Sequence, residues 1–252
     1  MNTADSIRVW QGFMNTQFQA EKEKFHELLG SVFIPVTSQI MQPIGLQAYF
    51  PGILEYTNQK LPDEIALVVY PSQDQYYLAS RDTVIGRAYG KLHGDVFNFQ
   101  ASGSSPASWS NFPVKYTNQS VQAGDCFYFA GVELDWQALE MRCLCFEFIP
   151  ADNEEDNIHA KVSHLLEGYK AKTSEGTLAE VIISIGETYC LVWLCSTSSS
   201  TGVATVEASD SVTLKFDLTA AKQDIKPIWT TKDYGLNVSA GTLLNIINSG
   251  QN

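Results

Sequence analysis

A chain of 252 residues, 44% of them hydrophobic, is long enough for one large domain or two small ones and can bury a sizeable core. This composition excludes a disordered or fibrous protein. The 16 basic residues are outnumbered by 28 acidic ones. The resulting net charge of −12 argues against binding to nucleic acid or to an anionic membrane, because both require a basic surface.

The first hundred residues are predicted to follow the order strand, helix, strand, strand, helix. The predicted elements are a strand over 7–14, a helix over 17–37, strands over 46–56 and 64–70, and a helix from Asp82 or Thr83 to Phe97. Apolar side chains recur at threes and fours through the first helix, which Pro35 is expected to kink or end. The run IALVVY indicates a buried strand that stops at Pro71.

The second part of the chain repeats this order after a segment over 101–125 that is rich in Ser, Asn, Gly and Pro. The predicted elements are strands over 114–117, 126–134 and 142–149, a helix that starts near the acidic residues 153–156, strands over 180–185, 189–195 and 212–218, and a short helix over 240–247. We therefore expect a ferredoxin-like domain over 1–100, a linker with additional strands over 101–140, and a second α+β domain over 141–252. The halves share no notable sequence identity, so the order of elements leaves open whether they are structural repeats.

A β-α-β-β-α-β order is the ferredoxin-like arrangement. The layout of residues 6 to about 100 resembles that of the dimeric α+β barrel group, which includes the antibiotic-biosynthesis monooxygenase-like and stress-responsive barrel proteins. The segments that carry the resemblance are VWQGFM at 9–14, the helix at 17–36, IALVVY at 65–70 and YGKLHGDVF at 89–97, with a weaker echo from 141 to about 220. The resemblance implies an α+β fold of ferredoxin-like units whose sheets close a barrel, either between two chains or, if the halves are repeats, between two tandem copies in one chain. It also implies a small, partly apolar cavity between sheet and helices, but it transfers no catalytic residue.

Three aromatic residues are candidate ligand contacts because each belongs to a different predicted strand. Trp10, Tyr49 and Tyr70 would line a cavity if they share one face of the sheet. The alternative is that they pack in an ordinary core.

A candidate catalytic residue, His93, lies in the sequence KLHGD near the end of the second predicted helix, close to Asp95. Imidazole titrates near neutrality, which suits acid–base chemistry. The alternative is a histidine at a helix end that interacts with the helix dipole.

Arg87 belongs to a local basic group in an acidic chain, together with Arg81 and Lys91. Tyrosines lie close by in the sequence, at Tyr76, Tyr77 and Tyr89. Such a group can hold an anionic aromatic ligand through bidentate and cation–π contacts. The alternative is a solvated helix face.

The five cysteines are predicted to be buried, reduced thiols, because most lie in apolar strand-like segments. On strands, Cys143 and Cys145 would share a face, whereas Cys190 and Cys195 would point to opposite faces. His159 and His164 are five apart on a predicted helix and do not share a face. We therefore expect no metal site and no cofactor, and the sequence carries no nucleotide-binding or hydrolase motif.

The N-terminal sequence MNTADSIRVWQGFM lacks the pattern of a secretory signal, and no apolar run approaches the ~18 residues of a membrane span. We therefore expect a cytoplasmic protein.

Two classes of function remain open. The first is a small-molecule-binding α+β barrel, in its most concrete form a cofactor-free oxygenase acting on a small aromatic substrate at Trp10, Tyr49, Tyr70 and His93 or Arg87. The alternative is a non-enzymatic oligomeric or interaction protein, since a fold alone does not imply function. A third hypothesis is that the protein binds haem, with His93 as an axial ligand.

Overall fold

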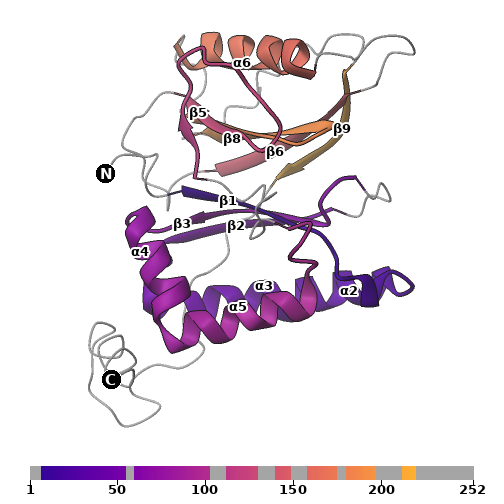
Figure 1. The fold of residues 1–252 in the computed structure, drawn as a ribbon, viewed down its shortest axis with the longest axis vertical. Coiled ribbons are helices and arrows are strands. Elements are labelled where there is room, and N and C mark those ends of the chain that lie inside the picture. Colours follow the sequence, from indigo (N-terminus) through magenta and orange to yellow (C-terminus); the bar gives the residue numbers. More distant parts are fainter. Residues whose placement is uncertain are drawn as a thin grey trace.

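The computed structural model describes residues 7–54, 60–102, 112–129, 140–148, 158–174, 180–196 and 212–219. Helices, an antiparallel sheet and a mixed sheet form four layers, so the chain has an α+β fold. A layer of helices covers a three-stranded sheet, this sheet faces a six-stranded sheet, and a single helix covers the far side (Figure 1). The predicted helix over 240–247 lies outside the described residues.

The first sheet consists of β1 (Ile7–Gly12), β2 (Ala48–Ile53) and β3 (Glu64–Val69) in the order β1-β3-β2, with both pairs antiparallel. Successive side chains of a strand point to opposite faces. In β1, Ile7 and Val9 therefore face the second sheet, whereas Trp10 faces the helices. This alternation determines which residues can reach a site under the helices.

Between β1 and β2 the chain forms one interrupted helical segment. Its parts are η1 (Thr16–Phe18), α2 (Lys22–Leu28), the π-helical turn η2 (Leu29–Phe33), α3 (Ile34–Met41) and η3 (Gln42–Ile44). Pro35 does not end the helix, because it lies in the first turn of α3, where its missing N–H group costs little. The segment stops at Gly45, whose φ of 121° favours glycine.

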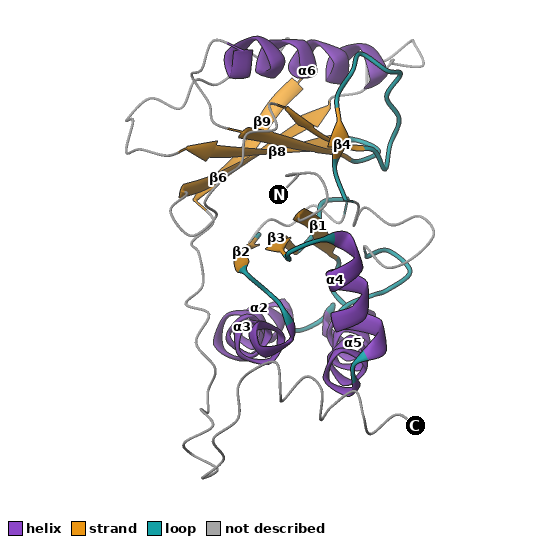
Figure 2. Cartoon of the chain, turned by 90° about the vertical axis from the view of Figure 1, so that its left-hand side faces the viewer, coloured by secondary structure: helices purple, strands orange, loops and turns teal. Residues whose placement is uncertain are grey.

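After β3 the chain forms α4 (Gln73–Tyr77), the π-helical turn η4 (Leu78–Asp82) and α5 (Val84–Val96). The predicted cap is confirmed, because the Thr83 hydroxyl accepts a hydrogen bond from Gly86 N at 2.8 Å. The sequence did not predict α4 or η4, since five-residue segments are too short to show a helical period. Helices α3 and α5 lie side by side under the first sheet (Figure 2).

The second sheet has the order β4-β5-β7-β8-β6-β9, and among its described strands only the β4–β5 pair is parallel. Its strands are β4 (Val114–Lys115), β5 (Cys126–Phe129), β6 (Glu140–Phe148), β7 (Glu180–Ile185), β8 (Tyr189–Ser196) and β9 (Val212–Thr219). Helix α6 (Ile158–Ser174) covers its outer face. The strands within 101–140 thus join the second sheet.

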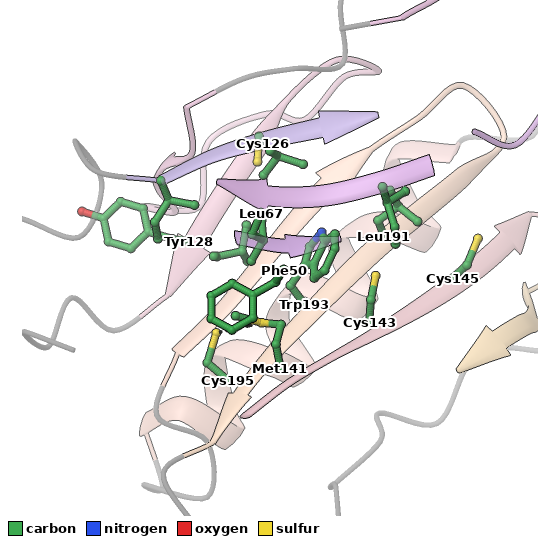
Figure 3. Close-up of a cluster of buried hydrophobic side chains, with 14 of the residues drawn as sticks. Phe50, Leu67, Cys126, Tyr128, Met141, Cys143, Cys145, Leu191, Trp193 and Cys195 are labelled. Atoms are coloured by element: carbon green, nitrogen blue, oxygen red, sulfur yellow. Dashed lines mark hydrogen bonds between the residues drawn. The ribbon is translucent and has the colours of Figure 1, made fainter. Parts of the chain in front are cut away.

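The two sheets share one apolar core, which Figure 3 shows in close-up. Phe50 and Leu67 of the first sheet pack with Trp193 and Leu191 of the second. Among the described residues, Gln11 forms a polar link across this core: its Nε2 donates to Ser184 Oγ at 2.7 Å, and the Tyr189 hydroxyl donates to Gln11 Oε1 at 2.5 Å. The sheets are therefore joined by burial and by directed hydrogen bonds.

The five cysteines are buried and free, as predicted. Cys143 and Cys145 share the face that meets the first sheet, whereas Cys190 and Cys195 point to opposite faces. Burial raises the pKa of the Cys143 thiol well above its ordinary value, so this thiol stays protonated and packs as a small apolar side chain. Within the described residues, no helix is long and apolar enough to cross a membrane.

Candidate functional site

The three predicted aromatic contacts lie together on the helix-covered face of the first sheet. Trp10 comes from β1, Tyr49 from β2, and Tyr70 directly follows β3. All three are buried and belong to the core cluster between this sheet and its helices. Their side chains share one face because alternation along the three strands points them the same way.

Glu64 is a buried carboxylate on this face, at the start of the middle strand β3. It is 1% exposed, and it accepts hydrogen bonds from Trp10 Nε1 at 2.9 Å and from the Tyr49 hydroxyl at 3.1 Å. Burial raises the pKa of Glu64 to about 7, although the two donors lower it. Within the described part of the chain, no arginine or lysine forms an ion pair with Glu64. Glu64 can therefore gain or lose a proton near neutral pH.

Two buried hydroxyls belong to the helices that cover this face. Thr37 of α3 hydrogen-bonds to the Tyr89 hydroxyl of α5, and its Oγ1 donates to Phe33 O at 2.8 Å. Burial raises the pKa of Tyr89 well above its ordinary value, and a hydrogen bond from Thr37 opposes this effect. Both hydroxyls are thus neutral hydrogen-bonding groups at physiological pH.

His93 lies on α5, and its imidazole ring is surrounded by aromatic rings from several elements. Its ring centroid is 4.2 Å from that of Tyr89, 4.7 Å from that of Phe33 and 5.3 Å from that of Trp10. Its Nδ1 atom lies 3.0 Å from Tyr89 O, so its partner is a backbone carbonyl and not the neighbouring carboxylate of Asp95. Burial lowers the pKa of His93 to about 4, which keeps the ring neutral at pH 7.

Gly12 allows the close packing around Trp10. A Cβ atom at this position would lie 2.9 Å from Trp10 Nε1 and 2.6 Å from an atom of the Phe97 ring. Gly12 also pairs with Glu64 in the antiparallel register of β1 and β3. The missing side chain lets the indole lie over the strand and reach the carboxylate.

A cationic and aromatic group borders the site. The Arg8 guanidinium lies 4.5 Å from the Tyr76 ring centroid and 5.8 Å from that of Trp10. Arg87 lies elsewhere: it is exposed on α5, and its Nη1 atom donates to the carbonyl oxygens of Arg81 and Asp82 at 3.2 Å. The structure therefore places Arg87 outside the group of residues around Glu64.

Glu64, Thr37 and Phe33 were not predicted from the sequence as candidate residues. Alternation along β3 places Glu64 on the same face as Ala66 and Tyr70, and this pattern could have identified Glu64. Thr37 and Phe33 are four residues apart on a helical segment, a spacing that puts both on one face. Their meeting with Tyr89 depends on how α3 packs against α5, which no local pattern encodes.

The helix-covered face of the second sheet differs from that of the first. Val162, Leu165 and Tyr169 of α6 pack on apolar side chains such as Leu144 and Ile183. The buried polar residues described on β7, Glu180 and Ser184, alternate with these apolar positions and therefore lie on the opposite face. Across the described residues, no group of His, Cys, Asp and Glu side chains could hold a metal ion.

Comparison with known proteins gives little guidance. No family model and no curated protein matches this chain. A protein from Fusobacterium nucleatum subsp. nucleatum ATCC 25586, provisionally named a monooxygenase, has a TM-score of 0.36 at 6% identity, over 78% of this chain and 77% of its own.

Two further solved structures are similarly distant. One from Lactobacillus acidophilus NCFM, also provisionally named a monooxygenase, has a TM-score of 0.32 at 10% identity over 77% of both chains. An anthrone oxidase-like protein has a TM-score of 0.35 at 6% identity, over 91% of this chain and 99% of its own. These values are too low to support an argument about function, which has to come from the site itself.

The site combines two ionisable groups of different character within one aromatic enclosure. Trp10 touches both of them: its indole donates to Glu64, and its ring contacts His93. At pH 7 the carboxyl group is poised to exchange a proton, whereas the imidazole is neutral. This arrangement suits acid–base chemistry on an aromatic molecule.

Proposed function

We propose that the helix-covered face of the first sheet binds a small aromatic compound that carries an acidic proton, and that Glu64 receives this proton. Trp10, Tyr49, Tyr70 and His93 would contact the compound, and Arg8 with Tyr76 would border it. A buried carboxylate without a cationic partner in the described residues carries this proposal, because its burial costs stability and because carboxyl groups with shifted pKa values cluster at functional sites.

The most specific form of this proposal is a cofactor-free oxygenase. Transfer of a proton to Glu64 leaves an electron-rich aromatic anion, and molecular oxygen can oxidise such an anion directly. Conversion of an activated CH₂ group to a carbonyl consumes one O₂ and releases one water, so atoms and electrons balance without a further reductant. The chain would supply the base, exclude water and orient the ring.

Calorimetric titration with 2-naphthol and 2-methoxynaphthalene tests the binding step. Glu64→Gln should weaken 2-naphthol binding about tenfold, because a hydrogen bond to a charged group contributes about 1.5–3 kcal/mol. Binding of the methoxy compound should change little, and the exposed Glu23→Gln should leave both affinities unchanged. Equal naphthol affinity in wild type and Glu64→Gln would refute the role of Glu64. The absence of any binding would favour an oligomeric or interaction role.

Oxygen uptake with 2-tetralone, which has an acidic CH₂ group, separates turnover from binding. The wild type should consume oxygen without an added cofactor, and Glu64→Gln should not. Saturable binding without oxygen uptake would restrict the function to binding.

We also propose that the two halves are tandem copies of a ferredoxin-like unit. In the first half a helical segment joins the outer strands of the order β1-β3-β2, and in the second α6 joins those of β6-β8-β7. The strand β9 adds to β6 at the position of a fourth ferredoxin-like strand. The first copy would carry the ligand site, and the second, apolar under α6, would complete the shared core.

A further inference from the structure

We propose that Arg8 is a second recognition point of this site, and that the ligand is an aromatic acid whose carboxylate lies at the end opposite its acidic hydroxyl. Arg8 binds the carboxylate, while Glu64 receives the proton of the hydroxyl. The part of this inference that concerns Glu64 rests on the function proposed above. The part that concerns Arg8 is tested separately, with a ligand that has no hydroxyl.

Strand alternation places Arg8 on the face that carries the site. Arg8 lies on β1, two residues before Trp10, so both side chains point to the helix-covered face of the first sheet. The contacts agree with this placement. The Arg8 guanidinium lies 5.8 Å from the Trp10 ring centroid and 4.5 Å from that of Tyr76 on α4. A positive charge therefore belongs to the same face as the Glu64 carboxyl group.

The register of the sheet separates Arg8 from Glu64 along the strands. Arg8 is opposite Val68 on β3, whereas Glu64 is opposite Gly12 on β1. The two charged residues are thus four positions apart in register, which is roughly 13 Å at about 3.3 Å per residue. The face therefore carries a cation at one end and a carboxyl group at the other.

The Trp10 indole bridges the interval between these two groups. Its Nε1 atom donates to Glu64 Oε2 at 2.9 Å, and its ring lies beside the Arg8 guanidinium. A flat ligand of two fused rings that lies along this indole has one end at Glu64 and the other at Arg8. The two polar groups of such a ligand must then be at opposite ends of its ring system.

The two ends of the face differ in their access to solvent. The Arg8 side chain is only partly buried, whereas Glu64 is 1% exposed. A ligand can therefore bury its rings and its neutral hydroxyl at Glu64 and keep its anionic end near water, which limits the cost of desolvating a charge. A guanidinium presents five N–H donors in a fork that matches the two oxygens of a carboxylate. The exposed end of the face thus suits an anion.

Calorimetric titration of the full chain at pH 8 with 2-naphthoate, which has the carboxylate but no hydroxyl, tests the Arg8 contact. Arg8→Gln should weaken this binding about tenfold, because the variant loses hydrogen bonds between charged groups. Arg8→Lys keeps the charge but not the fork, so its affinity should lie between the two. The exposed Arg87→Gln removes the same charge outside the site and should leave the affinity unchanged.

Titration with 6-hydroxy-2-naphthoate, which carries both groups at opposite ends, tests whether one ligand reaches both residues. The wild type should bind it about tenfold more tightly than either 2-naphthol or 2-naphthoate, because the second contact needs no further association step. Arg8→Gln and Glu64→Gln should each reduce this gain. The isomer 3-hydroxy-2-naphthoate, whose two groups are adjacent, should show no such gain.

The outcomes distinguish this inference from the proposed function. Equal affinity of 2-naphthoate for the wild type and Arg8→Gln, or no binding of 2-naphthoate, overturns the role of Arg8 whatever 2-naphthol does. An equal gain with both hydroxynaphthoate isomers, or no gain with either, overturns the arrangement of the ligand between the two residues. Failure of 2-naphthol to bind, together with 2-naphthoate binding that depends on Arg8, would refute the proposed function and leave the Arg8 contact standing.

Discussion

At the scale of single residues, burial acts on Glu64 and His93 in opposite directions. It raises the pKa of the carboxyl group to about 7 and lowers that of the imidazole to about 4, because the neutral form is favoured in both cases. The site therefore presents one neutral ring and one group that titrates near physiological pH. The proposed acid–base chemistry depends on this difference.

The raised pKa of Glu64 predicts how stability changes with pH. Its contribution to the free energy of unfolding is fully present below the unfolded pKa of 4.5 and is lost as pH rises to about 7. Relative to Glu64→Gln, the wild type should lose about 2–3 kcal/mol between pH 4.5 and pH 8. Urea unfolding of both proteins at these two pH values measures the difference.

His93 does not disturb this comparison. Its lowered pKa makes stability fall as pH drops from 6.5 to about 4, but the effect is common to both proteins and cancels in the difference. A difference between wild type and Glu64→Gln that stays constant with pH would show that Glu64 has an ordinary pKa.

The residues of the site were only partly predictable from the sequence. Trp10, Tyr49 and Tyr70 meet because they lie on neighbouring strands with matching alternation, which a sequence can reveal. Glu64 was not predicted as a site residue, because a charged residue at the start of a strand usually faces solvent. Its burial results from Trp10 and Tyr49, which approach it from other strands.

At the scale of elements, the turn between η4 and α5 is a point of close backbone contact. A Cβ atom on Gly86 would lie 1.9 Å from Ala79 O, and backbone cannot move aside as a flexible side chain can. Gly90, one turn further along α5, has no atom within 4 Å of such a Cβ position. The two glycines form a matched pair on one helix.

Gly86→Ala should therefore destabilise the protein by about 2–3 kcal/mol, since overpacking forces the backbone to shift. Gly90→Ala should be neutral or stabilise by up to about 1 kcal/mol, because alanine favours a helix. Thermal and urea unfolding of the two variants measure these effects. Equal stability of the two variants would contradict the close approach of η4 to α5.

The elements themselves were largely predictable, but the π-helical turns were not. The Thr83 cap and the apolar period identified α5 from local sequence alone. In contrast, the π-helical turn η2 inserts an extra residue between α2 and α3, and its sequence does not differ visibly from that of the two flanking helices. Its effect is to bring Phe33 against His93 and Tyr89, a tertiary contact that local propensity does not encode.

At the scale of the whole molecule, the two sheets share one core and should unfold together. Gln11 is the polar link between them, and its loss leaves the hydroxyls of Ser184 and Tyr189 without this partner. Gln11→Met, of similar size, should cost about 2–3 kcal/mol. The exposed Gln75→Met should change stability by less than about 0.5 kcal/mol.

Urea unfolding followed by circular dichroism and by tryptophan fluorescence measures both quantities. A single transition should appear with both probes, because neither sheet can leave the shared core alone. Two separate transitions, or a Gln11→Met variant as stable as the wild type, would contradict a joint core held by this link.

The layers could be predicted from the order of elements, but the difference between the two helix-covered faces could not. Both halves read as similar alternations of apolar and polar residues. Only the packed structure shows that Glu64 lies on the helix-covered face of the first sheet. Glu180 of the second half lies on the face of its sheet that points away from α6. A single buried carboxylate therefore distinguishes the two helix-covered faces described.

The most direct measurement is an NMR titration of the ¹⁵N-labelled chain with 2-naphthol, observed at the tryptophan indole groups. Trp10 Nε1 donates to Glu64 inside the site, whereas Trp193 lies between the sheets and provides an internal control. We predict a saturable shift of the Trp10 indole signal and none at Trp193. A Trp10 signal that does not move, or that moves only in step with Trp193, would contradict a ligand site on the first sheet.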